Sequence, residues 1–363
     1  MPRRMGYDRW LFVTAGLLVL GGILMVGSAS HYFAMSSGMS PWHFFARHVV
    51  YVVLGSVALV AAMRFPYRRL DDARFALGSA AACVLALVAV LAMPAAGGAR
   101  RWFPLGIASV QPSEVAKLAL ILFLAYVLSR REEKVHETLA VPLPCLALTG
   151  LMAALVAIEP DLGSAVMLCA ICGTMLFVAG LRWSWIGAAA GVAFVGAVVA
   201  VLAEPYRIQR IRTFWNPTED LQGSGFQLWQ SLIAVGSGGL TGTGLGQGRQ
   251  KALFLPAAHT DFIFSVVGEE LGLLGTGLLL LAFSILFWRG MRAAMRAPDR
   301  FGFYLVLGTT ALLTLQGFIH MGVCLGLLPT KGLPLPFVSW GGSSLIASMV
   351  GMGWILNVSQ YSN

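Results

Sequence analysis

Charged side chains are scarce in this chain. Of its 363 residues only 11% are Asp, Glu, Lys or Arg, while 58% are hydrophobic. In a soluble domain about a quarter of the residues are charged, so this balance excludes an ordinary soluble domain and predicts an integral membrane protein. A charge placed in or against a bilayer is costly, so those of the 16 acidic residues that lie in or against the apolar runs are the first candidates for chemistry.

Cysteines and metal-binding patterns are also sparse. All five cysteines fall inside apolar runs, and the spacing of Cys169 and Cys172 lacks the βαβ setting of a redox motif, so we interpret them as packing residues. No group of His, Cys, Asp or Glu has a convincing metal-ligand spacing. No resident metal or cofactor is expected, although a requirement for a divalent cation such as Mg²⁺ or Mn²⁺ is left open.

Ten apolar runs divide the chain. Most approach the roughly 20 residues that a helix needs to cross the hydrocarbon core. Helices are the expected spanning structure because backbone polar groups in lipid must bond within their own segment. The sequence therefore predicts an all-α polytopic membrane protein, with residues 1–363 forming a single domain of ten transmembrane helices. The predicted spans are residues 11–28, 49–63, 76–95, 115–128, 141–158, 162–181, 185–203, 262–287, 303–328 and 337–356.

Basic residues indicate the orientation of these spans, because loops rich in Lys and Arg stay in the cytoplasm. With the N-terminus inside, most Lys and Arg lie in inner loops, so both termini are predicted to be cytoplasmic. Inner loops that face anionic lipid headgroups then explain most of the net charge of +9, and we set nucleic acid aside as a partner.

One connection, residues 204–261, is long and lies on the outer side between the seventh and eighth spans. A long loop in a compact protein is more often functional than idle. Residues 207–215 mix cations with aromatic side chains, as a segment in the headgroup layer does. Residues 225–233 repeat apolar side chains at helical spacing, which predicts an interfacial helix.

The sequence His259-Thr260-Asp261 comes just before the eighth span. A carboxylate at that membrane edge can meet a substrate headgroup and keep a partly raised pKa, as a general base requires. The alternative is that Thr260 or Asp261 caps the helix that follows. We favour a functional Asp261, because carboxylates at the membrane edge are functional by default. Two turns further on, Glu269 and Glu270 either form a structural pair satisfied by a buried cation or support the site.

A second group precedes and begins the fourth span. Glu114 and Lys117 lie three residues apart on one helix face, where they either form an internal ion pair or help to hold an anionic substrate. Arg101 and Trp102 lie just before them, and an interfacial Trp is common in membrane proteins.

Three loops could complete an outer cleft. Asp161, in the turn between the fifth and sixth spans, either serves the turn, collaborates with Asp261, pairs with a cation such as Arg101, or holds a metal ion. A glycine-rich run, residues 236–248, is followed by Arg249 and Lys251. It predicts a flexible loop that approaches other backbone closely, and its amides and cations would also suit a pyrophosphate. Residues 331–344, with Pro and Gly interrupting the start of the tenth span, either line the cleft or simply lead into the helix.

These blocks together resemble the SEDS family of bacterial cell-wall polymerases, named for shape, elongation, division and sporulation. The block Arg249-Gln250-Lys251 is similar to the division branch, FtsW, more than to the elongation branch, RodA. The family often has Glu where Ala257 stands and Tyr where Trp340 stands, which puts an accessory carboxylate at position 257 in doubt. The strings that carry the resemblance are Gly98-Ala-Arg-Arg-Trp102, Gln111-Pro-Ser-Glu114, Glu159-Pro-Asp-Leu-Gly163, Gly238-Gly-Leu-Thr-Gly242, Ala258-His-Thr-Asp-Phe-Ile-Phe264, Gly268-Glu-Glu-Leu-Gly272, Lys331-Gly-Leu-Pro-Leu-Pro336 and Gly341-Gly-Ser-Ser344.

The resemblance implies a peptidoglycan glycosyltransferase that joins lipid II, an undecaprenyl-pyrophosphate-linked disaccharide-pentapeptide, to a nascent glycan strand. It implies Asp261 as the general base, a class B penicillin-binding transpeptidase and other division proteins as partners, and a place in the bacterial cytoplasmic membrane at the division septum. The pyrophosphate would lie near Arg101, Arg249, Lys251 or Lys117. The substrate-binding candidates are Arg101, Trp102, Glu114, Lys117, Asp161, Arg249, Lys251, His259, Thr260, Lys331 and Ser343.

The sequence is also compatible with three further functions. A lipid II flippase would place ionisable groups near the bilayer midplane, and Lys117 with the pair Glu269 and Glu270 keeps that interpretation open. An elongation polymerase of the RodA type and a scaffold of the division machinery also remain candidates.

Overall fold

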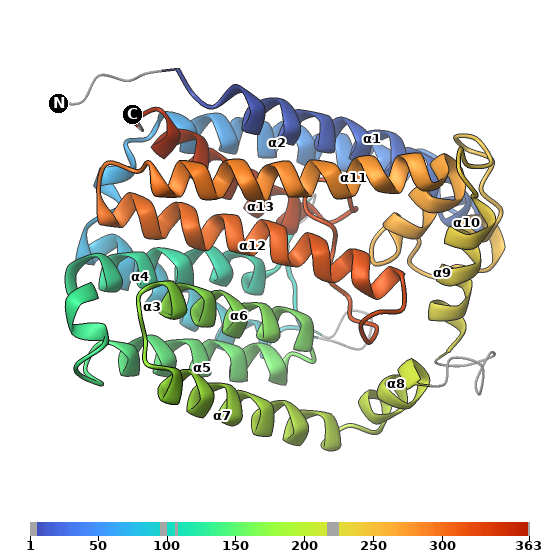
Figure 1. The fold of residues 1–363 in the computed structure, drawn as a ribbon. Coiled ribbons are helices and arrows are strands. Elements are labelled where there is room, and N and C mark those ends of the chain that lie inside the picture. The colour runs from blue at the N-terminus through green and yellow to red at the C-terminus, as the bar shows by residue number, and fades with distance from the viewer. Residues whose placement is uncertain (1–5, 95–99, 106–107, 216–224, 362–363) are drawn as a thin grey trace.

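The computed structural model describes residues 6–94, 100–105, 108–215 and 225–361, and these are almost entirely helical (Figure 1). The all-α polytopic architecture predicted from the sequence is confirmed. The longer helices are α1 (Arg9–Ser36), α2 (His43–Arg64), α3 (Ala73–Val90), α4 (Pro112–Val135), α5 (Pro142–Ile158), α6 (Leu162–Val178), α7 (Trp183–Leu202), α11 (Ile263–Met295), α12 (Arg300–Cys324) and α13 (Gly342–Ser359). The shorter elements are the 3-10 turn η1 (Tyr67–Arg69), the helices α8 (Pro205–Trp215), α9 (Phe226–Ser237) and α10 (Gln250–Leu253), and the strands β1 (Phe103–Leu105) and β2 (Ala108–Val110).

Each of the ten predicted apolar runs coincides with one of the longer helices. Eight of these helices are long and apolar enough to cross a membrane. The other two, α5 and α6, are apolar but have 17 residues each, at the lower end of the range for a span. The exact number of ten transmembrane helices therefore stays a prediction.

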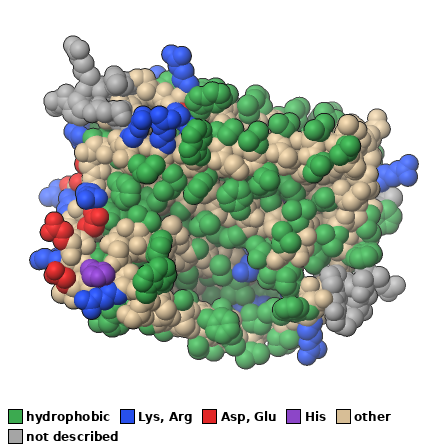
Figure 2. All heavy atoms as spheres, in the orientation of Figure 1, with side chains coloured by type: hydrophobic (Ala, Val, Ile, Leu, Met, Phe, Trp, Pro, Cys, Tyr) green, Lys and Arg blue, Asp and Glu red, His purple; other side chains and the backbone are tan. Residues whose placement is uncertain are grey.

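The helices lie side by side, with both chain ends at the same end of the bundle (Figure 1). Helices α4, α12 and α13 form its centre, where α12 packs on α4 and α11, and α13 packs on α2. By contrast, none of the described residues of α7 is buried, and this helix lies at the edge of the bundle. Apolar side chains are spread over the face of the molecule shown in Figure 2, whereas the acidic side chains visible there gather at the end where the termini lie.

Two span boundaries differ from the prediction, and one small element was missed. The ninth span ends at Cys324, where Gly326 has a φ of 70° and the Leu327 amide donates to the Gly322 carbonyl. The tenth begins at Gly342, because residues 335–339 form a tight turn in which Phe337 has a φ of 67°. Between α3 and α4, β1 and β2 form an antiparallel hairpin with Phe103 opposite Val110. Its strands have three residues each, too few to leave an alternating hydrophobic pattern in the sequence.

The described parts of the long connection between α7 and α11 contain the short helices α8, α9 and α10. The predicted helix at residues 225–233 is confirmed as α9, which packs on α11. The glycine-rich run after α9 approaches α11 closely, as predicted: a Cβ on Gly238 would lie 1.8 Å from the carbonyl oxygen of Gly268, and one on Gly242 would lie 2.1 Å from that of Glu270. Residues 225–261 of this connection are therefore folded against the bundle.

Candidate active site

Asp261 lies at the end of a tight turn that leads into α11. The amides of Thr260 and Asp261 both donate to the carbonyl oxygen of Ala257, at 3.0 and 3.1 Å, and Ala257 has a φ of 54°. The N-cap of α11 is Phe262, and within the described residues no side chain caps this helix. The capping explanation for Thr260 and Asp261 is therefore wrong, and the hydroxyl of Thr260 instead donates to the Ala257 carbonyl.

The segment before α13 holds this turn from the other side. The hydroxyl of Ser339 donates to the carbonyl oxygen of Thr260 at 2.7 Å, and the amide of Trp340 donates to that of His259 at 2.9 Å. Gly332 faces the carboxylate, since a Cβ at this position would lie 3.1 Å from Asp261 Oδ2. The residues that interrupt the start of the tenth span thus form one wall around Asp261, which is one of the two interpretations that the sequence allowed.

The electrostatic surroundings suit Asp261 to proton transfer. Burial raises the pKa of this half-buried carboxyl to about 6, Arg210 and more weakly Arg101 act to lower it, and Asp161 acts to raise it. Such a group is largely ionised at neutral pH and is still basic enough to accept a proton. Arg210, on α8, was not among the candidates. The only sequence signal for it was the mixture of cations and aromatics in residues 207–215.

Arg101 braces the turn between α5 and α6. Its guanidinium donates to the carbonyl oxygens of Glu159 and Pro160, at 2.7 and 2.5 Å, so it pairs with backbone rather than with the acidic side chains of this turn. The Glu159 carboxyl is buried without a hydrogen-bond partner among the described residues. Burial, assisted by Asp161 and opposed by Arg101, raises the pKa of Glu159 to about 8, so this side chain is mainly neutral at pH 7.

Asp161 connects this turn to the hairpin. One of its oxygens accepts from the amide of Ser164 at 3.0 Å and so caps α6, while the other accepts from the side-chain amide of Gln111 at 3.1 Å. Ser343 supports the same hairpin. Its hydroxyl donates to the carbonyl oxygen of Ser109 and accepts from the backbone amide of Gln111, both at 3.0 Å. The turn function of Asp161 is thus present, together with its electrostatic effect on Asp261.

Lys117 forms an internal ion pair with Glu114, one of the two alternatives that their spacing allowed. Its ammonium lies 2.8 Å from Glu114 and donates to Gln316 of α12 at 3.0 Å, and both charged side chains are buried. The amide of Gln316 in turn donates to the Pro334 carbonyl at 2.8 Å, in the segment that faces Asp261. Lys117 therefore supports that segment through Gln316, and direct contact with substrate stays a prediction.

His259 and Lys331 flank Asp261 differently. The ring of His259 is buried 4.9 to 5.7 Å from the rings of Phe33, Phe44 and Trp340, and burial lowers its pKa to about 4, so it carries no charge at neutral pH. Lys331 is half-buried beside Gly332, and burial lowers its pKa. Trp102 is half-buried in the segment that leads into β1.

Lys251 and Arg249 lie at the glycine-rich loop, where Lys251 lines a cavity of about 180 Å³ together with His259. The ammonium of Lys251 forms a buried ion pair with Glu270 and donates to Ser28. The amide of Arg249 donates to Glu269 at 2.6 Å, and its side chain is exposed. The sequence grouped these two cations with the pyrophosphate candidates, but the structure brings Arg101, Arg210 and Asp161, not Lys251, into the electrostatic surroundings of Asp261.

The cluster lies where five segments converge at the end of the bundle away from the termini: α8, the turns before α4, α6 and α11, and the segment before α13. Figure 2 shows a recess toward this end, between α6 and the edge formed by α7 and α8, with Lys or Arg side chains at its bottom.

Gly97, Gly98 and Gly106, which belonged to the same sequence block as Arg101, lie outside the described residues. Among the described residues, no three His, Cys, Asp or Glu side chains come together as a metal site.

Comparison with known proteins gives one consistent group. A family model for FtsW, RodA and SpoVE, described as "Cell cycle protein", matches residues 8–363. The chain is 42% identical to the probable peptidoglycan glycosyltransferase FtsW of Geobacter metallireducens, over 97% of this chain and 94% of that protein. It is 40% identical to the stage V sporulation protein E of Bacillus subtilis, over 98% and 97%.

Solved structures give the same result. The chain is similar to a chain in a solved structure titled "Structural coordination of polymerization and crosslinking by a peptidoglycan synthase complex". The TM-score is 0.77, and the two sequences are 32% identical over 97% of each chain. It is also similar to the rod shape determining protein RodA of Thermus thermophilus, with a TM-score of 0.71 and 30% identity over 97% and 96% of the two chains.

Proposed function

Because this chain belongs to the FtsW, RodA and SpoVE family of cell cycle proteins, we propose that it is a peptidoglycan glycosyltransferase that polymerises lipid II during cell division. The observation that carries the proposal is the half-buried Asp261, with a pKa of about 6, in the electrostatic field of Arg210 and Arg101. A base of this strength and nearby cations are what glycosyl transfer from a pyrophosphate requires.

In the proposed reaction, the Asp261 carboxylate takes the proton of an acceptor sugar hydroxyl. The hydroxyl oxygen then forms a bond to the anomeric carbon of the donor sugar, while the bond from that carbon to the pyrophosphate oxygen breaks. Inversion at this carbon gives the β-1,4 link, and undecaprenyl pyrophosphate leaves with the electron pair. Arg210, Arg101 and Lys331 are suited to stabilise the charge that develops on the leaving group.

The setting of this reaction is part of the proposal. We place Asp261 at the outer face of the cytoplasmic membrane and both termini in the cytoplasm, since the distribution of basic loops favours this orientation. A class B penicillin-binding transpeptidase is the proposed partner, because a structural relative comes from a peptidoglycan synthase complex. The division septum is the proposed location, supported by relatives named FtsW.

The division branch is favoured by the names of the relatives that this chain matches, not by the percentage of identical residues. The FtsW of Geobacter metallireducens and the sporulation protein of Bacillus subtilis are 42% and 40% identical to this chain, a difference too small to separate the branches. Complementation of FtsW, RodA or SpoVE depletion by this chain would distinguish the three.

A lipid II flippase remains the second candidate. The buried ion pair of Lys117 with Glu114 favours it, because charged pairs within spans mark transport pathways in many carriers. Translocation of lipid II headgroups in liposomes without polymer would support transport.

The decisive test is reconstitution of the purified full chain with labelled lipid II. It is run with and without the transpeptidase and with Mg²⁺ or Mn²⁺, and the products are sized on a gel. Asp261→Asn keeps the shape of the side chain and removes the base, so we expect polymerisation to fall about 10²-fold or more with unchanged membrane insertion.

The matched control is Asp71→Asn, which changes an exposed carboxylate at the opposite end of the bundle. It should polymerise at the wild-type rate. Near-normal glycan synthesis by Asp261→Asn would refute the assignment of the base.

A further inference from the structure

Helix α11 is broken, and another part of the chain completes it. At Gly272, with φ 64° and ψ −157°, the backbone leaves the helical conformation. In an unbroken helix the amides of residues 273 and 274 would bond the carbonyls of residues 269 and 270. Here Leu273 and Leu274 instead donate to the carbonyls of Gly239 and Leu240, at 2.9 and 3.2 Å.

The carbonyls released by the break are satisfied by the same loop. The amide of Thr243 donates to the carbonyl of Glu269 at 2.9 Å, and the amide of Gly244 donates to that of Glu270 at 3.0 Å. Residues 239–244 are thus spliced into α11 and exchange four backbone hydrogen bonds with it. Backbone polar groups at membrane depth must be satisfied, so the loop and the break depend on each other.

The carboxylates at the break hold the next part of the loop. Glu269 accepts from the amides of Arg249 and Gln250, at 2.6 and 3.1 Å, at the start of α10. Glu270 accepts from the Gly246 amide at 3.0 Å and from the Ser28 hydroxyl of α1 at 2.8 Å.

Glu270 also carries the buried ion pair with Lys251. The two side chains are 0% and 1% exposed, and the Lys251 ammonium further donates to Ser28 at 2.5 Å. Glu270 therefore connects three elements, α1, α10 and α11, through one buried charge.

Asp261 lies between the two partners of this ion pair. Lys251 and Glu270 are 19 positions apart, and their side chains close the intervening chain into a loop. Asp261 is near the middle of that loop, at the start of the short helical stretch that ends at the break. The contacts of residues 239–251 with the broken helix α11, here called the spliced joint, therefore set where this stretch begins. They also set where Asp261 lies relative to the segment before α13.

We propose that Glu270, Glu269 and Lys251 are positioning residues for the reaction, which fix Asp261 by locking the loop after α9 into the broken helix α11. This inference rests on the proposed function of Asp261. Lys251 then positions Asp261 instead of holding a pyrophosphate, and Glu269 and Glu270 have the same positioning role. Displacement of a reacting group by about 1 Å can cost about 10²-fold in rate, so a lock of this kind has a measurable effect.

The test uses the full chain and separates positioning from folding. Glu270→Gln and Lys251→Met each leave one buried partner uncompensated, while the double variant Glu270→Gln/Lys251→Met removes both charges and avoids an unpaired ion. Lys251→Arg keeps the charge and should retain more of the wild-type rate than the double variant does. Arg130→Gln, which breaks an exposed ion pair at the other end of the bundle, is the matched control.

Two readouts are needed. Steady-state polymerisation of lipid II gives kcat and KM, and amide hydrogen exchange reports residues 255–262 separately from α4 and α13. We expect the double variant to lose about 10²-fold in kcat with KM within about twofold of wild type. We also expect faster exchange at residues 255–262, with wild-type protection in α4 and α13.

Three results would overturn the proposal. A double variant with wild-type kcat would show that the lock does not position Asp261. A tenfold rise in KM at unchanged kcat would show that Lys251 binds substrate. General loss of protection in the double variant and in Lys251→Arg would show that the pair holds the whole fold. Wild-type protein without polymerase activity would refute the proposed function instead, and the exchange experiment would still report the lock.

Discussion

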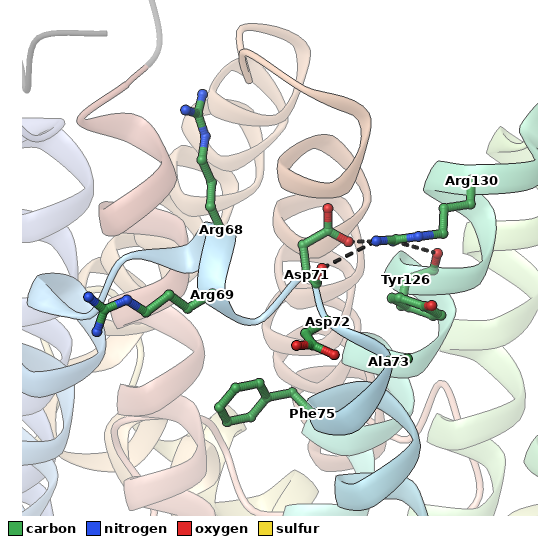
Figure 3. Close-up of a pocket in the computed structure, with 8 residues that line it drawn as sticks. All are labelled: Arg68, Arg69, Asp71, Asp72, Ala73, Phe75, Tyr126 and Arg130. Carbon is green, nitrogen blue, oxygen red and sulfur yellow. Dashed lines mark hydrogen bonds and ion pairs between the residues drawn. The ribbon is translucent and has the colours of Figure 1, made fainter. Parts of the chain in front are cut away.

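The two ends of the bundle carry different kinds of ion pair. Toward the Asp261 end, Lys251 and Glu270 are 1% and 0% exposed and lie inside a joint between three helices. At the end where the termini lie, Arg130 and Asp71 are 43% and 33% exposed and line an open pocket of about 540 Å³ (Figure 3). Both pairs are short, so distance does not separate them, whereas burial does.

The pocket in Figure 3 is open, and its acidic side chains have partners within the protein. Arg130 pairs with Asp71, and Asp72 caps α3 through the Arg74 amide. Exposed pairs of this kind contribute about 0–1 kcal/mol, because water screens them. The Asp261 end has the opposite character, since a buried charge that loses its partner is costly. Burial of charge, rather than pocket size, therefore indicates which end does chemistry.

The largest effect that would test this contrast is expected from Gly272→Ala. A Cβ at this position would lie 2.4 Å from the Gly242 nitrogen, in a backbone conformation that favours glycine. Strain and overpacking together should destabilise the protein by about 2–6 kcal/mol. Thermal unfolding in detergent measures this.

Gly277→Ala is the control for that experiment. It lies further along the same helix, where a Cβ would meet nothing within 4 Å. It should unfold at or slightly above the wild-type temperature, since Ala favours a helix more than Gly does. Equal unfolding temperatures for the two variants would contradict the spliced joint.

An intermediate effect is expected from Arg210→Gln. Arg210 opposes the burial that raises the pKa of Asp261 to about 6. The rate should fall as pH drops through that pKa, because a protonated carboxyl cannot accept a proton. Removal of the cation raises the pKa further, so the acidic limb of the rate profile should move to higher pH.

The measurement is the rate of polymerisation between about pH 5 and 8, where the ionisation of a carboxyl of this pKa changes. Arg212→Gln, on the same short helix, is the control and should keep the wild-type profile. An acidic limb that stays in place in Arg210→Gln would show that this cation does not act on the base.

The smallest effect is expected from Arg130→Gln. It breaks the exposed pair with Asp71, so stability should change by less than about 1 kcal/mol and the polymerisation rate should be unchanged. Chemical unfolding and the lipid II assay check both. A loss of rate here would remove the functional contrast between the two ends.

Much of the site was predictable because its signals are local. Asp261 stood out as a carboxylate at the edge of an apolar run, and the spacing of Glu114 and Lys117 predicted the ion pair that the structure contains. The glycine-rich run predicted close backbone approach, which α11 now explains. Arg210 and Gln316 were missed, since each acts on the site through contacts with residues far away in the sequence.

The sequence by itself determined a helical membrane protein with an acidic residue poised before its eighth apolar run, because scarcity of charge and the length of apolar runs are properties of the chain alone. The tertiary structure decided which charges serve that residue. Lys251 is paired with Glu270, and Arg210 reaches the field of Asp261. The reason is physical: a buried charge takes the partner that folding brings to it, and no spacing within one helix fixes which partner that will be.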